Sequence, residues 1–154
     1  MRTRLPRLTA VGLAAFTVAG VATGARHSNT FGLKAPLDAR QEVPPQTVKV
    51  RAARGTFTGT LTVTASRTTV AWSLTFSHLS GRALGADIHR GALGKSGPIA
   101  VRLCRPCRSG TRGKATLAAK AIRAIKTGRA YVNVVTRKNP NGEIRGQIRL
   151  IQGY

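Results

Sequence analysis

The stretch GTFTGTLTVT, residues 55–64, decides the fold class of this chain. Its apolar side chains Phe57, Leu61 and Val63 alternate with threonines, which is the period-two pattern of a half-buried β-strand. A second alternating run follows the polar residues ASRTT, and its apolar members are Val70, Trp72, Leu74 and Phe76. The two runs predict two adjacent strands joined by a polar turn.

The same period recurs three times further along the chain. The apolar positions of these runs are Ile99, Val101 and Leu103, then Val132 and Val134, then Ile144, Ile148 and Leu150. Between the last two runs, residues 139–142 read Asn-Pro-Asn-Gly. Pro140 fixes one backbone dihedral and Gly142 permits an unusual one, so this segment predicts a tight hairpin turn.

One segment has the spacing of a helix. In LAAKAIRAIKTG, residues 117–128, four apolar residues fall on one helical face and Gly128 marks the end. The residues on this face are Leu117, Ala121, Ile122 and Ile125. Regularly spaced strands with so little helix predict an all-β fold, an antiparallel β-sandwich or barrel of about seven or eight strands with one short helix.

The N-terminal residues have the layout of a secretory signal. Three arginines precede an uncharged, mostly apolar run, and small residues follow it. The run is shorter than the roughly 20 strongly apolar residues of a membrane span. We therefore predict a signal peptide at 1–25, a flexible lead-in at 26–32 and one β domain at 33–154, with no transmembrane span after signal removal. The product is expected to be secreted or associated with the cell envelope, and an uncleaved anchor is the alternative.

The charge of the chain is strongly unbalanced. It contains 26 basic residues against four acidic ones, a formal net charge of +22. Without residues 1–26, 22 basic residues face the same four acids, which leaves a charge near +18. Such a surface attracts anionic envelope polymers, lipid head groups or nucleic acid through long-range fields rather than a fitted site. Solubility of outward-facing strand positions is the simpler explanation of the same residues.

Asp87, His89 and the remote His78 are the candidate metal ligands. A His-x-His pair on a strand places two imidazoles on one face, which suits copper or zinc, but this chain reads Asp87-Ile88-His89. A hydrogen-bonded structural histidine is the simpler interpretation of His89, and His78 is expected to be an exposed loop residue. We predict no metal site and no cofactor.

The hexapeptide GALGKS, residues 91–96, resembles the end of a phosphate-binding loop. The first glycine of that motif would have to stand at position 89, which is His89. The motif must also open a helix, whereas this stretch leads through Gly97 and Pro98 into a predicted strand. The sequence therefore does not predict a nucleotide loop.

Cys104 and Cys107 are the only cysteines. In a reducing compartment their spacing would suggest zinc or thiol redox chemistry, but zinc would need a second ligand pair. In an exported protein the pair more simply forms one local disulfide, and the small closed loop places its stabilisation at about 1–2 kcal/mol.

Acid-base and nucleophilic chemistry are poorly supplied. The four acidic residues are dispersed along the chain, and no serine lies in a Gly-x-Ser-x-Gly setting. They are Asp38, Glu42, Asp87 and Glu143. The aromatic residues Phe57, Trp72 and Phe76 occupy the apolar phase of their strands, so they are not predicted to offer stacking platforms for single-stranded nucleic acid. The sequence indicates a protein that is not an enzyme and that does not bind nucleic acid specifically.

Four blocks of the sequence together resemble the CHRD domain, the module named after chordin. They read LDARQEVPP at 37–45, TVAWSLTFSHLSG at 69–81, ADIHRGALGKSGPIAVRLC at 86–104 and AYVNVVTRKNPNGEIRGQI at 130–148. The motif residues that carry the resemblance are Glu42, Pro44, Pro45, His89, Gly91, Gly97, Pro98, Tyr131, Asn133, Gly142, Glu143, Arg145 and Gly146.

The resemblance implies an immunoglobulin-like β-sandwich or Greek-key barrel, distantly similar to copper/zinc superoxide dismutase around a His-x-His turn. It implies no assignable enzymatic activity, because the family lacks an established biochemical role. In chordin-like animal proteins the module belongs to antagonists of extracellular growth factors. Where many members have histidines, this chain has Asp87 and Val135, and both departures weigh against dismutase-like chemistry.

We therefore predict a secreted, single-domain, non-catalytic protein that acts by binding or by structural presence at the cell envelope or in the extracellular space. Its partner there is not identified by the sequence, and its affinity for polyanions is expected to be weak. His89 and Asp87 are expected to pin the turn at 91–97 through hydrogen bonds to its backbone. Two alternatives stay open: a copper- or zinc-dependent redox protein using Asp87, His89 and His78, and a thiol-disulfide protein using Cys104 and Cys107.

Overall fold

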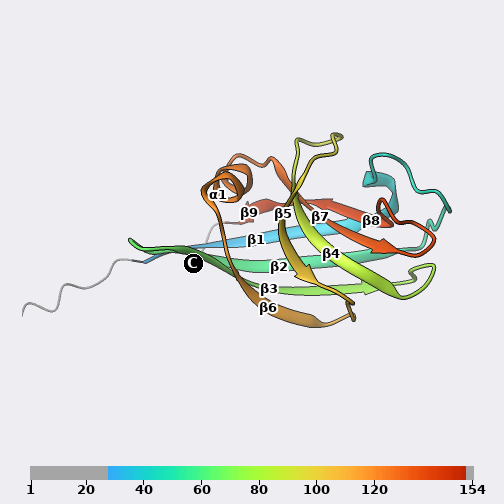
Figure 1. Cartoon of the computed structure of the whole chain (residues 1–154), viewed down its shortest axis with the longest axis horizontal. Coiled ribbons are helices and arrows are strands. Elements are labelled where there is room, and N and C mark those ends of the chain that lie inside the picture. Colours follow the sequence, from blue (N-terminus) through green and yellow to red (C-terminus); the bar gives the residue numbers. More distant parts are fainter. Residues whose placement is uncertain (1–27, 152–154) are drawn as a thin grey trace, which may run out of the picture.

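The computed structural model describes residues 28–151 of the chain (Figure 1). This part contains nine β-strands, one α-helix and one short 3-10 helix, joined by loops and turns. The strands are β1 Asn29–Asp38, β2 Arg54–Val63, β3 Thr68–Ser77, β4 Ala83–Arg90, β5 Ile99–Cys104, β6 Thr111–Thr116, β7 Ala130–Thr136, β8 Ile144–Gln147 and β9 Arg149–Ile151. The helices are η1 Ala39–Gln41 and α1 Ala119–Lys126. The predicted signal at 1–25 lies outside the described residues.

The strands form one curled antiparallel sheet in the order β5-β4-β7-β8-β1-β2-β3-β6, with β9 also paired to β1. The chain passes from β3 to the distant β4 and then returns from β5 to place β6 beside β3, a Greek-key type of connection. The curl brings the sheet's two ends, β5 and β6, toward each other (Figure 1). The predicted all-β antiparallel sandwich or barrel is confirmed.

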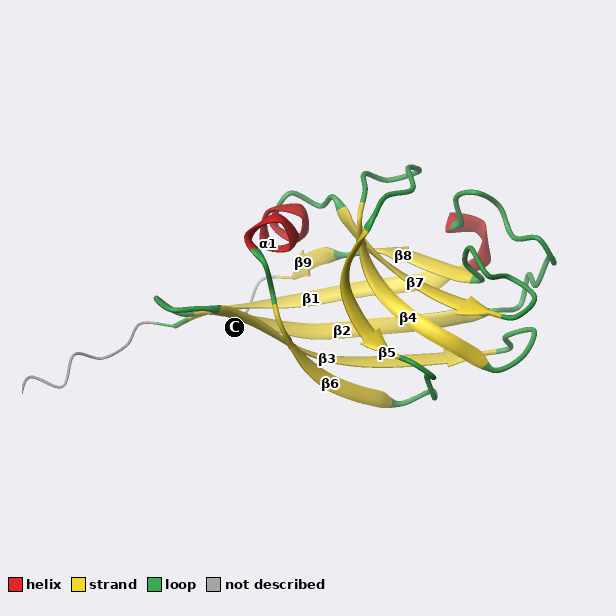
Figure 2. Ribbon diagram, viewed as in Figure 1, coloured by secondary structure: helices red, strands yellow, loops and turns green. Residues whose placement is uncertain are grey.

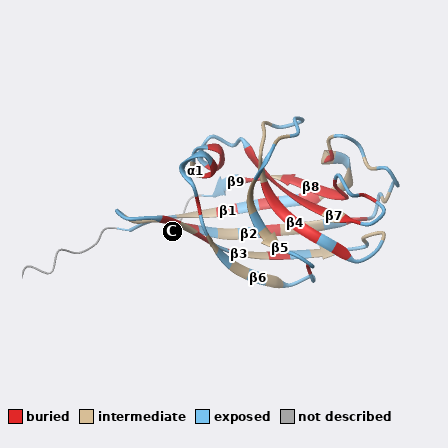
Figure 3. Ribbon diagram, viewed as in Figure 1, coloured by how far each residue is buried: buried red, intermediate tan, exposed pale blue. Residues whose placement is uncertain are grey.

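The stretch that opened the sequence analysis forms β2, an inner strand of this sheet between β1 and β3. β2 and β3 pair over ten residues, with Phe57 opposite Leu74 and Leu61 opposite Val70. All four side chains are fully buried, because the register places the apolar phase of both strands on the inner face. Figure 3 shows buried residues recurring along these strands and across β1, β4, β7 and β8. The core is therefore the inside of the curled sheet.

The β domain begins earlier than the sequence predicted. The lead-in was expected to extend to residue 32, yet Asn29 to Gly32 pair with β2, from Asn29 opposite Val63 to Gly32 opposite Thr60. The sequence carries a signal for this earlier start, because Phe31 continues the alternation of Leu33, Ala35 and Leu37. β6 has no apolar alternation, and it forms a strand because β3 offers it a pairing edge.

Two predicted apolar runs are less buried than their alternation suggests. Ile99 is exposed and the rest of β5 is at most half-buried, because β5 lies at the end of the sheet. The run at 144–150 breaks at Ile148, which is fully buried, and continues as β9, where Leu150 is exposed. A continuous alternation in the sequence thus spans two short strands.

The predicted helix is confirmed as α1, which crosses one end of the barrel between β6 and β7 (Figure 2). The side chains of Ala121, Ala124 and Ile125 form the buried face of α1. Gly128 follows the helix with a left-handed φ of 65°. Glycine adopts that conformation without steric cost. Within residues 28–151, no helix has the length and apolar character needed to cross a membrane.

The core can be tested at Phe57. Replacing Phe57 with alanine removes a side chain with 0% exposure, and the expected loss is about 3–5 kcal/mol in the free energy of unfolding. The neighbouring Thr58→Ala variant removes an exposed side chain of the same strand, so its expected loss is below about 1 kcal/mol. Urea denaturation of both variants measures the difference, and equal losses would contradict the assignment of inner and outer faces.

Candidate functional site

The three candidate metal ligands lie in separate environments. The Nδ1 of His89 donates a hydrogen bond to the carbonyl of Gly97 at 2.9 Å, and Asp87 pairs with Arg105 at 2.5 Å. His78 is exposed, with a left-handed φ of 57°. Within residues 28–151, no group of three His, Cys, Asp or Glu side chains is placed to hold a metal ion.

The turn after β4 is therefore pinned by one of the two predicted side chains. His89 holds the turn as expected, but Asp87 does not contact its backbone, and this prediction was wrong. The carboxylate of Asp87 is almost fully buried and faces Arg105, which follows the neighbouring strand β5. The pairing of β4 with β5 determines this contact, and the sequence spacing alone does not reveal it.

Cys104 and Cys107 form a disulfide, as predicted, with their Cα atoms 5.2 Å apart. Cys104 ends β5 and Cys107 is buried against the core. The backbone N–H of Cys107 donates to the carbonyl of Ala83 at 3.2 Å, so the cross-linked loop is also attached to the start of β4. The disulfide thus holds together the segment that connects β5 to β6.

Arg145 is the central polar residue of the motif blocks. Its side chain is only 2% exposed, and its guanidinium carbon lies 3.5 Å from the ring centre of Tyr131. The same tyrosine ring stacks against His89, with ring centres 5.0 Å apart. The Nη2 of Arg145 donates to the carbonyls of Ala92 and Lys95, at 3.3 and 2.8 Å. A buried guanidinium on β8 thereby holds the β4–β5 loop.

Other motif residues hold the same loop. The hydroxyl of Tyr131 accepts a hydrogen bond from the backbone N–H of Gly97 at 3.1 Å. The Nε2 of Gln147 donates to the carbonyls of Gly91 and Gly128, at 2.9 and 2.8 Å. A Cβ atom at Gly97 would collide with the backbone carbonyl of Arg90, so only glycine fits there. The loop conformation is consequently set from inside the barrel.

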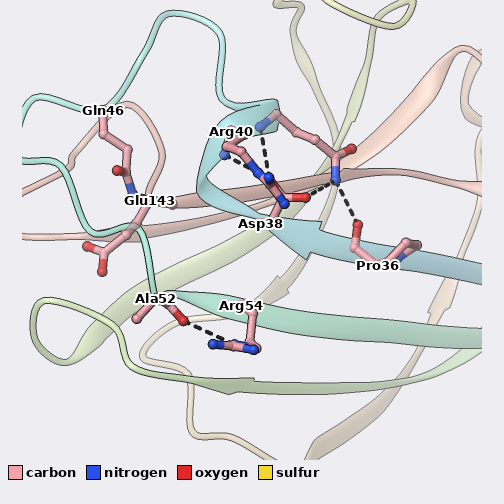
Figure 4. Close-up of polar contacts among 8 residues, drawn as sticks. Pro36, Asp38, Arg40, Gln46, Ala52, Arg54 and Glu143 are labelled. Carbon is pink, nitrogen blue, oxygen red and sulfur yellow. Dashed lines mark hydrogen bonds and ion pairs between the residues drawn. The ribbon is translucent and has the colours of Figure 1, made fainter.

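Glu143 is the second centre of the buried polar network, with 0% exposure. It accepts hydrogen bonds from the backbone and hydroxyl of Ser80, the hydroxyl of Thr136 and the amide of Asn139. Burial would raise the pKa of Glu143, but these hydrogen bonds to the ionised form outweigh it and hold the pKa below its usual value. Gln46 donates to the backbone carbonyl of Glu143 at 2.6 Å (Figure 4). The network thereby joins the loop between η1 and β2, the segment between β3 and β4, and the turn between β7 and β8.

Glu42 lies beside this network in a different state. It is 4% exposed, and neither carboxylate oxygen receives a hydrogen bond from residues 28–151. Burial raises its pKa to about 8, against the opposing effect of Arg145, and Glu143 adds to the rise. The carboxylate and the Oδ1 of Asn133 occupy the space that a side chain at Gly142 would need, and Gly142 has a φ of 150°. Glu42 is therefore largely protonated at neutral pH.

The remaining motif residues differ in their placement. Gly146 lies against the backbone of Pro36, too close to admit a side chain, and the amide of Asn133 donates to the carbonyl of Asn141 at 2.9 Å. Pro44 and Pro45 are exposed in the loop after Glu42 and do not reach the network. The motif residues thus hold loops at both ends of β4 and β7, the β4–β5 loop at one end and the segments around Ser80 and Asn139 at the other.

Three of the four acidic side chains are buried, and the fourth caps a helix end. Glu42 and Glu143 are buried, and Asp87 is paired with Arg105. Asp38 caps η1, accepting hydrogen bonds from the backbone N–H groups of Arg40 and Gln41 (Figure 4). Between residues 28 and 151 only Arg40 and Arg105 make ion pairs. The other basic residues of this part make no ion pair.

Four of these cations line one pocket that the sequence analysis did not single out. The open pocket measures about 720 Å³ and lies between α1, the end of β4 and the turn before β7. Its basic residues are Arg90, Lys120, Arg123 and Arg129. The spacing of Lys120 and Arg123, three residues apart on the polar face of the predicted helix, was the one sequence signal for it.

The geometry defines an all-β module whose buried polar residues hold loops at both ends of β4 and β7. The family model of the CHRD domain matches residues 33–148, which covers all four motif blocks, and the chain belongs to the CHRD domain family. Comparison with curated proteins gave no match, and comparison with solved structures gave none either.

The state of Glu42 predicts a pH-dependent stability. Between pH 4.5 and about 8 the unfolded chain loses a proton that folded Glu42 keeps, so stability falls as the pH rises through this window and then levels off. The Glu42→Gln variant lacks this loss. Its free energy of unfolding relative to the natural chain should rise by up to roughly 4 kcal/mol from pH 4.5 to 8.

Chemical denaturation at several pH values measures this difference. The comparison at pH 4 is the internal control, because the side chain is protonated in both states there. Glu143 has the opposite effect, because its contribution to the free energy of unfolding is lost on acidification. This contribution is common to both proteins, so it cancels in the difference between them. A difference that stays constant from pH 4.5 to 8 would contradict the protonated state of Glu42.

The disulfide is expected to stabilise the fold modestly. Reducing it should lower the free energy of unfolding by about 1–2 kcal/mol, because the closed loop is short. Denaturation with and without reductant measures the effect. In the Cys104→Ala, Cys107→Ala double variant the reductant should have no effect, which separates the cross-link from other actions of the reagent. An unchanged stability of the natural chain on full reduction would contradict a structural role.

Proposed function

We propose that this protein is a secreted, non-catalytic binding protein that contacts anionic polymers of the cell envelope or the extracellular space through its cationic surface. The observation that carries the proposal is that three of the four acidic side chains are buried and the fourth caps η1. Basic side chains without carboxylate neighbours create a positive field that attracts polyanions over long range. Binding partners, rather than internal ion pairs, neutralise this surface.

The placement of the motif residues supports the non-catalytic part of the proposal. Arg145 and Glu143 are enclosed and hold loops, and the ring nitrogen Nδ1 of His89 is bonded to the backbone. A general acid or nucleophile must reach a substrate, whereas these side chains face one another and the main chain. Their arrangement favours a scaffold that presents its outer surface.

Two features support secretion. The predicted signal at 1–25 has the order of charge, apolar residues and small residues that export requires. The disulfide between Cys104 and Cys107 suits an oxidising compartment. The partner in that compartment is proposed by chemistry alone, as a polymer of negative charge.

Chromatography on anionic polymers tests the proposal. The protein should bind a sulfated polysaccharide and a polyphosphate support, and both should release it at much higher salt than a neutral protein of similar size. Long-range attraction depends on charge density and is screened by salt, so polymer chemistry should matter little for most of the surface. Elution together with the neutral protein would contradict the proposal.

A further inference from the structure

The pocket beside α1 differs from the rest of the cationic surface because it is concave and charged from three segments. Arg90 ends β4, Lys120 and Arg123 belong to α1, and Arg129 precedes β7. Its other lining residues are small or apolar, including Ala92 and Pro98. Four cations thus surround a floor that offers them no acceptor side chain other than the hydroxyl of Thr127, which itself donates to Arg123's carbonyl.

No carboxylate lines this pocket. The helix α1 contains no acidic residue, and none of the four pocket cations has an ion pair within residues 28–151. A second basic hollow provides a contrast, since Arg40, Arg51 and Arg54 share it with Asp38. The pocket beside α1 therefore holds four positive charges that only an external anion can neutralise.

The walls of the pocket are bonded to each other. The backbone N–H of Gly91, on the β4–β5 loop, donates to the carbonyl of Arg129 at 2.9 Å. Gln147 bridges the same two segments through the carbonyls of Gly91 and Gly128. The N–H of Arg129 donates to the carbonyl of Ala124 at 2.7 Å, which attaches the turn to α1. A pocket with fixed walls binds without an ordering cost for its backbone.

We propose that this pocket binds a multiply charged phosphate ligand, of the kind that carries two linked phosphate groups. Three of the four cations are arginines, whose planar guanidinium forks match the oxygen pairs of a phosphate. Four positive charges exceed what a single carboxylate neutralises. The volume of about 720 Å³ has room for two linked phosphates and a small attached group. This inference rests on the proposed function, because it assigns one specific site within the surface that attracts polyanions.

Titration with inorganic pyrophosphate tests the site. We compare the natural chain with two variants of equal charge: Lys120→Gln with Arg123→Gln in the pocket, and Arg137→Gln with Lys138→Gln in the β7–β8 turn. All four side chains are exposed, and the β7–β8 turn lies at the opposite end of the barrel from α1 (Figure 2). Calorimetry at constant ionic strength gives the affinities.

The pocket variant should bind pyrophosphate at least about tenfold more weakly, because it loses two charge-assisted contacts. The turn variant should bind within about twofold of the natural chain, since it changes only the long-range field. Equal weakening in both variants, or no measurable binding by the natural chain, would overturn the proposal. Glutamine keeps helix propensity, so the pocket variant is expected to fold.

A second measurement does not depend on any variant. Pyrophosphate added to the isotopically labelled natural chain should shift the amide signals of residues 90–92, 119–124 and 127–129 before others. Shifts spread evenly over the surface would overturn the site. Citrate at the same ionic strength is the carboxylate comparison, and binding as tight as pyrophosphate would overturn the phosphate assignment.

The physiological source of the phosphate is distinguished by two further probes. The affinities of the natural chain, the pocket variant and the turn variant are each measured for soluble polyphosphate and for vesicles of an anionic phospholipid. A source that uses the site loses more affinity in the pocket variant than in the turn variant. If anionic supports retain the protein but the pocket variant shows no specific loss of affinity, the proposed function stands and this inference is overturned. If the supports do not retain the protein and the pocket shows no specific effect, both proposals are overturned.

Discussion

The enclosed positive charge of Arg145 is the interaction on which the conformation of the β4–β5 loop depends. Burial lowers the pKa of its guanidinium, while Tyr131 and Glu42 act in the opposite direction, and a guanidinium remains charged in proteins. Tyr131 contacts it through the ring face, and two loop carbonyls accept its hydrogen bonds. Because a buried charge must be satisfied by neighbouring groups, the β4–β5 loop is held where its carbonyls can reach Arg145.

The two buried glutamates illustrate how position decides the state of identical side chains. Glu143 receives several hydrogen bonds and stays ionised, whereas Glu42 receives none from the described residues and is raised toward the protonated form. Both are removed from the surface, as is Asp87 beside Arg105. Burial of these acidic side chains leaves few carboxylates on the surface that carries most of the basic residues. The pocket beside α1 is a concave part of that basic surface.

The match to the CHRD domain family covers residues 33–148, which contain nearly all of the buried polar network. Asp87 and Val135, which stand where many family members have histidines, both have structural surroundings that need no metal ion. Asp87 has an arginine partner, and Val135 is half-buried on β7, paired in register with Gly85. The motif residues hold loops, and the basic residues that line the pocket are not among those motif residues, although Arg90 lies within one of the four blocks.

Local sequence determined most of the strands, the helix and the hairpin, because side-chain alternation, helical spacing and turn residues act over a few neighbours. It also determined the disulfide, since two cysteines three residues apart can meet without help from the rest of the chain. Tertiary structure alone decided that Asp87 faces Arg105 and that Arg90, Lys120, Arg123 and Arg129 share one pocket. These contacts join residues far apart in the chain, and strand order and curl, which no local pattern encodes, bring them together.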